Sequence, residues 1–165
     1  MIIGNFIKGT ELKYKKQYFS GICFDSSKCK KDNIFLAIKG TKTDGNKFIN
    51  HAIQKGAKII ISNLKFEGLK KNILFIRSNN VRKSLSEFAY TIYKDKPKNI
   101  IAVTGTNGKS SVADFYFQIL RLNKKKVASI GTLGIKTQNY IKKVSNTTID
   151  PITLSIILTK LKKEK

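Results

Sequence analysis

The chain has 165 residues, 41% of them hydrophobic, which is enough for a buried core in one domain or two small ones. No apolar run approaches the length of a membrane span and the N-terminus lacks the pattern of a signal peptide, so we expect a soluble, cytoplasmic protein with no membrane partner. The formal net charge of +23 comes almost entirely from lysines spread through every segment, with arginine only at positions 77, 82 and 121, so we expect no nucleic-acid partner.

The two cysteines, Cys23 and Cys29, fit neither a disulfide framework nor a zinc site, because no second cysteine pair and no nearby histidine accompanies them. We expect both thiols to be reduced, and Cys23 to be a small core residue on a strand.

The first part of the chain, residues 1–97, alternates short apolar runs with helical patterns, which predicts a small α/β domain. Helices are expected over 48–53, where Gly56 would act as the C-terminal cap, and over 80–94, where apolar residues recur at helical spacing. Strands are expected over 22–24, 34–38, 58–62 and 73–76.

A polar, proline-bearing break at 94–98 is the expected domain boundary, so residues 98–165 form a second domain. A buried strand over 100–103 opens it, another strand is expected over 127–130, and Asp150-Pro151 begins a helix as N-cap and first-turn proline. The helix between them is expected to bury Val112, Phe115, Tyr116, Ile119 and Leu120.

The segment between the first strand and the first helix of this second domain, residues 104–111, is predicted to be a phosphate loop. Gly105 and Gly108 permit tight turns that aim backbone N–H groups at an anion, and the helix N-terminus adds partial positive charge. Lys109 can reach the outer phosphates of ATP, and the Ser110 hydroxyl can ligate Mg²⁺. The expected ATP-binding residues are Gly105, Thr106, Asn107, Gly108, Lys109, Ser110 and Ser111.

This loop is a shortened match to the full P-loop pattern, which has a further glycine where this chain has Val103 and Thr104. An ordinary strand–turn–helix connection is the alternative interpretation. The predicted strand before the loop and the predicted helix after it favour phosphate binding, because the mechanism requires both.

From about Gly21 to its end, the chain resembles the N-terminal part of a Mur ligase of the MurE type. Four separated motifs carry the resemblance, and the shortened phosphate loop is itself usual in that family. The fourth motif separates the MurE type from the MurF type. The motifs are Asp25-Ser26-Ser27, the run 33–40 with Asp44-Gly45, the phosphate loop, and the run 146–154.

The resemblance implies a small uridine-binding α/β domain followed by the start of a P-loop, parallel-sheet, ATP-binding central domain. It implies that Lys109 is catalytic, acting on the ATP phosphates. Ser27 and Ile149 depart from the arginine and proline usual in the family. The residues implied to bind the UDP-linked substrate are Phe24, Ser26, Thr41, Lys42, Thr43, Asn146, Thr147 and Thr148.

The implied reaction adds the third peptide residue, a diamino acid such as meso-diaminopimelate, to UDP-MurNAc-L-Ala-D-Glu. ATP phosphorylates the D-glutamate carboxylate, and the incoming amine attacks the acyl phosphate. Phosphoryl transfer of this kind depends on positioning and charge neutralisation. The cofactors implied are ATP and Mg²⁺, and we expect a monomer.

Mur ligases have three domains, and this chain ends shortly after the second begins. We therefore expect an N-terminal fragment that is inactive by itself, with exposed apolar surface near its C-terminus. The alternatives are a MurF-type ligase, a folylpolyglutamate synthetase, a non-catalytic nucleotide-binding module and a basic nucleic-acid-binding protein.

Overall fold

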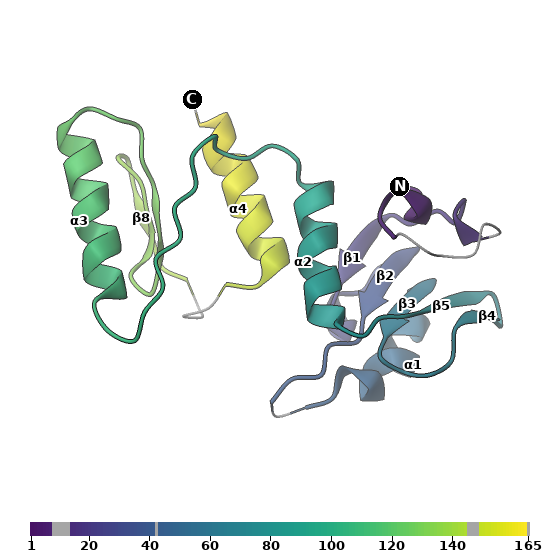
Figure 1. The fold of residues 1–165 in the computed structure, drawn as a ribbon. Coiled ribbons are helices and arrows are strands. Elements are labelled where there is room, and N and C mark those ends of the chain that lie inside the picture. The colour runs from purple at the N-terminus through teal and green to yellow at the C-terminus, as the bar shows by residue number, and fades with distance from the viewer. Residues whose placement is uncertain (8–13, 42, 145–148, 165) are drawn as a thin grey trace. The chain divides into compact units, whose positions relative to one another are not determined.

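The computed structural model describes residues 1–7, 14–41, 43–144 and 149–164. The chain divides into two compact units, Met1–Ile92 and Tyr93–Lys165, and both contain helices and strands (Figure 1). The fold is therefore mixed α/β, as the sequence predicts. In the part of the chain that the structure describes, no helix is both long enough and apolar enough to cross a lipid bilayer.

The first unit is built on a five-stranded sheet in the order β1-β2-β3-β5-β4. The four strands predicted from apolar runs are mutually parallel: β1 (Gly21–Cys23), β2 (Asn33–Leu36), β3 (Ile59–Ser62) and β5 (Ile73–Arg77). The sequence analysis missed β4 (Gly68–Lys70), which pairs antiparallel with β5 at the edge. This strand lies in a lysine-rich segment that has no apolar run.

The register of the parallel strands places one row of side chains on one face of the sheet. Cys23, Phe35, Ile60 and Phe75 are successive partners across β1, β2, β3 and β5. Short helix α1 (Ile49–Gln54), which follows the 3-10 helix η4 (Gly45–Phe48), packs on this row and contributes buried side chains to the same hydrophobic cluster. Gly56, at φ +103°, follows α1 and fulfils the predicted C-terminal role.

The neighbouring residues of each strand point to the other face, because side chains alternate along a strand. There the fully buried Ile34, Ile59 and Leu74 form a second row of register partners. Helix α2 (Val81–Ile92) contacts β2, and its Phe88 ring stacks on Phe6 at 5.2 Å between centroids. Phe6 lies just after the 3-10 helix η1 (Ile3–Asn5), so the N-terminus is part of this core.

The structure corrects our expectation that Cys23 and Cys29 are reduced: the two form a disulfide, with Cα atoms 5.7 Å apart. Cys23 ends β1, and the 3-10 helix η3 (Ser26–Lys28) turns the chain back so that Cys29 meets it. Both side chains are buried in the cluster under α1. Spacing alone could not show this, because the pairing depends on the turn that η3 makes.

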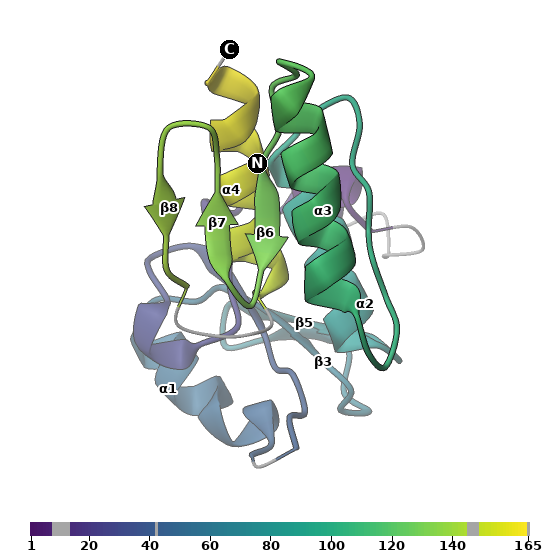
Figure 2. The same ribbon diagram turned by 90° about the vertical axis from the view of Figure 1, so that its left-hand side faces the viewer.

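The second unit places a three-stranded antiparallel sheet, β6 (Ser129–Gly131), β7 (Gly134–Lys136) and β8 (Ile141–Lys142), between two helices. These helices are α3 (Lys109–Leu122) and α4 (Pro151–Lys163) (Figures 1 and 2). Helix α4 begins as predicted, since Asp150 accepts hydrogen bonds from the N–H groups of Ile152 and Thr153 and Pro151 is the first helical residue.

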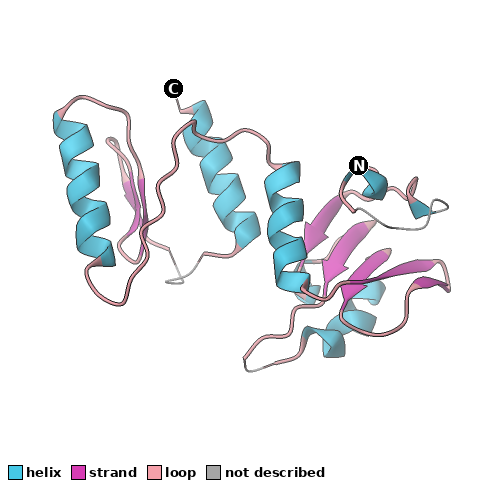
Figure 3. Ribbon diagram, viewed as in Figure 1, coloured by secondary structure: helices cyan, strands magenta, loops and turns pink. Residues whose placement is uncertain are grey.

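The prediction of a buried strand at the start of this unit is wrong. Residues 100–103 form a loop and not a buried strand (Figure 3), and Ile100 and Ile101 are 56% and 60% exposed. Only β6, β7 and β8 pair with one another in the described part of the unit, so this segment has no neighbour to complete its backbone hydrogen bonds.

Helix α3 buries a different face from the one that we expected. Phe117 is 3% exposed, and Leu120 is half-buried. The other expected core residues of this helix are exposed. They are Val112, Phe115, Tyr116 and Ile119.

A polar contact fixes α3 on the sheet. The Lys136 ammonium on β7 donates to the Asp114 carboxylate and lies 5.5 Å from the centre of the Phe117 ring. This hydrogen bond, followed by one from Gln118, holds the pKa of Asp114 below its ordinary value of 3.8. The orientation of α3 therefore depends on both an apolar and an ionic contact.

Candidate nucleotide and substrate sites

The predicted phosphate loop has the backbone shape that its glycines permit. Gly108 is the N-cap of α3 and adopts a left-handed conformation, with φ +76° and ψ −5°. Gly105 also has a positive φ, of +152°. A methyl group would meet no atom within 4 Å at Gly108, so the requirement for glycine there is conformational and not a matter of space.

The N–H groups of this loop are available to an anion. In the described part of the chain, no backbone or side-chain hydrogen bond is donated by the amides of residues 105–111, and the first amide to be bonded is that of Val112, to the Gly108 carbonyl. The 14-residue helix α3 adds the partial positive charge of its N-terminus. An oxyanion placed at this loop would thus meet several unsatisfied donors.

Lys109 and Ser110 are the first two residues of α3. The Lys109 ammonium folds back over the loop and donates to the carbonyl oxygens of Gly105 and Thr106, the latter at 2.9 Å. Ser110 is exposed, so its hydroxyl can reach a ligand. The lysine ammonium therefore lies against the carbonyl oxygens of the loop itself.

In the first unit, polar residues follow β1 directly. Asp25 accepts hydrogen bonds from the Ser27 N–H at 3.0 Å and from its hydroxyl at 2.7 Å, which caps η3. The Ser27 hydroxyl is the main cause that lowers the pKa of Asp25. The predicted substrate residue Phe24 is 37% exposed, whereas Ser26 is 8% exposed and its Oγ lies 2.9 Å from Nδ1 of His51 on α1.

The loop after β2 holds the next group of predicted substrate residues. The Gly40 N–H donates to the Thr43 carbonyl at 2.9 Å, which closes a tight turn with Thr41 and Thr43 exposed. Lys42 lies outside the described residues. Since β1 and β2 are adjacent and parallel, this loop and the one after β1 leave the same edge of the sheet, where ligands of open α/β sheets bind.

Asn46 and Asn63 belong to the same edge, and the sequence analysis missed them. The Asn46 side-chain amide donates to Asn63 Oδ1 at 2.8 Å, and the buried Asn46 Oδ1 has no hydrogen-bond partner. An orphaned acceptor is costly unless a ligand or water satisfies it. The sequence does contain a signal for Asn63, because this residue directly follows the apolar strand β3. Asp25 has a similar position, two residues after the end of β1.

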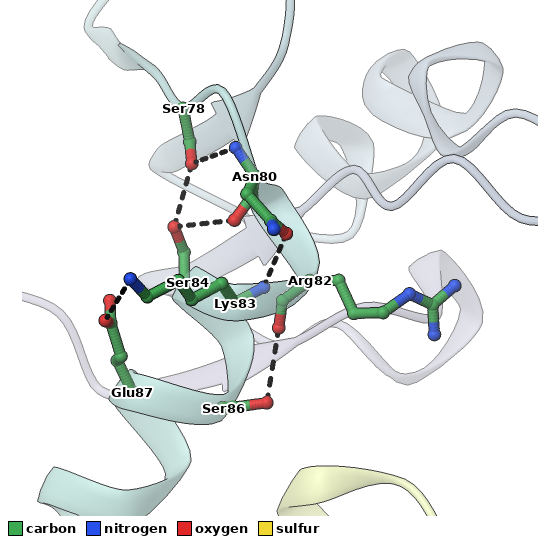
Figure 4. Close-up of polar contacts among 7 residues, drawn as sticks. All are labelled: Ser78, Asn80, Arg82, Lys83, Ser84, Ser86 and Glu87. Atoms are coloured by element: carbon green, nitrogen blue, oxygen red, sulfur yellow. Dashed lines mark hydrogen bonds and ion pairs between the residues drawn. The ribbon is translucent and has the colours of Figure 1, made fainter.

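At the same edge of the sheet, β5 ends and is followed by α2 (Figure 4). The Ser78 hydroxyl lies 2.9 Å from that of Ser84, and Asn80 Oδ1 accepts from the Lys83 N–H at 2.9 Å. The Arg82 side chain points away from these contacts. This network caps α2 with its own residues, so it explains the helix start without a ligand.

Three predicted substrate residues, Asn146, Thr147 and Thr148, lie outside the described residues. Among the residues that are described, no group of three or more His, Cys, Asp or Glu side chains could hold a metal ion. Any Mg²⁺ at the phosphate loop would therefore depend on Ser110 together with oxygens of the nucleotide and water, a ligand set that Mg²⁺ accepts.

A loop of unsatisfied amides at the start of a helix, in an α/β fold, is the arrangement expected of a phosphate-binding site. Family models agree and are more specific. The model of the Mur ligase family, catalytic domain, matches residues 18–100, and that of the Mur ligase middle domain matches residues 103–165. The chain belongs to the Mur ligase family.

Curated relatives bear the name UDP-N-acetylmuramoyl-L-alanyl-D-glutamate--2,6-diaminopimelate ligase. The protein of Buchnera aphidicola is 37% identical over 167 residues, which cover 95% of this chain and 32% of the relative. The protein of Fusobacterium nucleatum is 33% identical, over 98% of this chain and 34% of the relative. The protein of Clostridium tetani is 48% identical over 80 residues, which cover 46% of this chain and 16% of the relative. The chain thus spans about a third or less of these relatives.

Solved structures share the fold. A structure of a ligase of the same name aligns with 99% of this chain and 34% of its own, with a TM-score of 0.77 and 24% identity. The MurF ligase of Thermotoga maritima in complex with ADP aligns with 84% of this chain and 28% of its own, with a TM-score of 0.51 and 21% identity. Both likenesses concern the fold alone.

Proposed function

We propose that this chain is part of an ATP-dependent ligase that adds a diamino acid, meso-diaminopimelate, to UDP-MurNAc-L-Ala-D-Glu during the synthesis of peptidoglycan precursors. The names of the relatives support the substrates, and family membership supports ligase chemistry. The observation that carries the proposal is the set of unpaired amides at the start of α3, with Lys109 folded over them. As part of the same proposal, we expect a cytoplasmic monomer.

We assign residues 1–97 to a domain that binds the UDP-linked substrate and residues 98–165 to an ATP-binding domain. The compact units of the structure divide at Ile92 and Tyr93, close to this boundary, and this division supports the assignment. In the first domain, Phe24, Ser26, Thr41 and Thr43 stand at the carboxyl edge of a parallel sheet, together with Asn46 and its orphaned oxygen.

In the second domain, the amides of residues 105–111 would hold the ATP phosphates, and Lys109 would leave its two carbonyl partners to neutralise the outer phosphates. Mg²⁺, held through Ser110, would neutralise charge on the same phosphates. These groups position the γ-phosphoryl group for transfer to the D-glutamate carboxylate, after which the amine of the diamino acid displaces phosphate.

Binding to the full chain tests this proposal. Titration calorimetry should detect ATP with Mg²⁺ and, separately, UDP-MurNAc-L-Ala-D-Glu. Lys109→Ala should weaken ATP binding about 10- to 100-fold, the range for a hydrogen bond to a charged group, and leave the UDP-linked ligand unaffected.

Lys126→Ala is the matched control, because it removes one exposed positive charge beyond the other end of α3. It should leave ATP affinity within about twofold, since an exposed charge far from the ligand is screened. If wild-type chain does not bind ATP, or if both lysine variants weaken it equally, the phosphate-loop assignment is wrong.

A further inference from the structure

The hydrogen bond between Ser26 and His51 links the candidate substrate edge to a residue that no sequence motif indicates. Ser26 Oγ lies 2.9 Å from His51 Nδ1, 25 residues along the chain. Ser26 is 8% exposed, whereas His51 lies on the outer part of α1 and is the only histidine of the protein. The inference that follows rests on the proposed function, in which Ser26 contacts the UDP-linked substrate.

The backbone of the loop that carries Ser26 is held in place by local contacts, whereas the proton of the Ser26 hydroxyl can rotate. Asp25 caps η3, in which Ser26 is the first residue, and the Cys23–Cys29 disulfide closes the loop on both sides. A hydroxyl has one donor and two acceptor positions, and its proton rotates to suit its partners. The partner at 2.9 Å therefore decides what the hydroxyl can offer to a ligand.

His51 can direct this hydroxyl in two opposite ways. With a proton on Nδ1, the ring donates to Ser26 Oγ, and the serine proton is free for a ligand acceptor. Without that proton, Ser26 donates to Nδ1 and offers a ligand only lone pairs. A uridine diphosphate presents mainly acceptors, namely the phosphate oxygens and the two ring carbonyls.

We propose that His51 is a positioning residue for the UDP-linked substrate: its Nδ1–H donates to Ser26 Oγ and so aims the serine proton at an oxygen of the uridine diphosphate. His51 itself need not touch the ligand. His51 therefore contributes to the binding affinity as much as one correctly directed hydrogen bond from Ser26 does. Such a hydrogen bond changes the dissociation constant of the ligand about three- to tenfold.

Variants of the full chain separate this role from a general effect on the fold. With UDP as the probe in calorimetry, His51→Ala should weaken binding about three- to tenfold. His51→Asn should restore most of it, because the asparagine amide nitrogen occupies the same position relative to Cβ as Nδ1. Asn50→Ala, at an exposed neighbour on α1, is the matched control and should bind as wild type does.

A double-mutant cycle then asks whether His51 acts through Ser26. In a Ser26→Ala background, His51→Ala should cause no further loss, because the group that it directs is gone. Equal losses in both backgrounds would overturn the proposal, since they would mean a direct or a purely structural contribution. Circular dichroism of each variant checks that α1 and the sheet remain folded.

Because the chain has one histidine, its ring nitrogens give a single set of NMR signals. On saturation with UDP, Nδ1 should show the ¹⁵N shift of a protonated ring nitrogen, and a shift typical of an unprotonated Nδ1 would overturn the proposal. If wild type binds UDP but His51→Ala binds equally well, this inference alone fails. If wild type does not bind UDP, the proposed function of the first domain fails and this inference fails with it.

Discussion

Reduction of the Cys23–Cys29 disulfide should destabilise the first unit substantially. The bond closes a loop of seven residues, since the cysteines are six positions apart. In the chain-entropy model, cross-linking a loop of this length lowers the entropy of the unfolded state by about 8 cal/mol/K, or roughly 2.4 kcal/mol at 25 °C. For a unit of this size, such a loss corresponds to a fall in melting temperature of about 10 °C or more.

The assay is urea denaturation of the full chain, with and without a thiol reductant, followed by circular dichroism and by fluorescence of the tyrosines. The chain has two cysteines, so the reductant acts on this pair alone. A Cys23→Ser, Cys29→Ser double variant should match the reduced wild type and should not respond to reductant. Titration of free thiols in unfolded, unreduced protein should find none.

Two results would refute this reasoning. If unreduced protein contains two free thiols, the pair is not bonded in solution, and our first expectation from the sequence was right. If the bond is present but its reduction leaves the midpoint unchanged, the unfolded chain is already compact around this loop, and the entropy model overstates the effect.

Two further predictions concern single residues. Gly45→Ala should destabilise the first unit by about 1–3 kcal/mol in thermal denaturation, because the added Cβ would lie 2.6 Å from both the N and the O of Ile38. In the second unit, the lowered pKa of Asp114 means that its ion pair with Lys136 stabilises the fold above pH 3.8 and is lost as the pH falls through the lower, native-state pKa. Acid titration of wild type should therefore show a larger loss of stability below about pH 4 than that of Asp114→Asn, in which only other carboxylates such as Asp25 still contribute.

Each of these has a clear contrary outcome. A Gly45→Ala protein as stable as wild type would mean that the backbone around Ile38 can move away from η4 at little cost. An Asp114→Asn protein with the same acid transition as wild type would place the responsible carboxylate elsewhere.

The sequence predicted those elements whose signals are local. Apolar β-branched runs located the parallel strands, and helical spacing located α2, because both patterns depend on neighbours within a few residues. Asp150-Pro151 located the start of α4 for the same reason, since a cap and a first-turn proline act within one turn.

The failures concern features that depend on distant partners. The run at 100–103 has the composition of a strand, but a strand needs another strand beside it. Helix α3 has apolar residues on more than one face, so the position of the sheet, and not the spacing, decides that Phe117 is buried and Phe115 is 62% exposed. The Cys23–Cys29 bond depends on the turn of η3.

The candidate sites show the same division. The phosphate loop could be predicted from the sequence because its residues are contiguous, and the positive φ angles of Gly105 and Gly108 agree with the role predicted for these glycines. His51 could not, since only the packing of α1 against η3 brings it to Ser26. Residues that act through a neighbour carry no motif of their own.

The folded-back position of Lys109 has a consequence for how the chain would discriminate among anions. Its ammonium already rests on two carbonyl oxygens, so an incoming group must offer more than those oxygens do before the side chain transfers to it. A lone, weakly charged anion gains little from this exchange, whereas a polyphosphate with several negative oxygens gains much more. In the proposed site, the lysine would therefore leave its carbonyl partners only for a polyphosphate, and a small anion would be held by the loop amides alone.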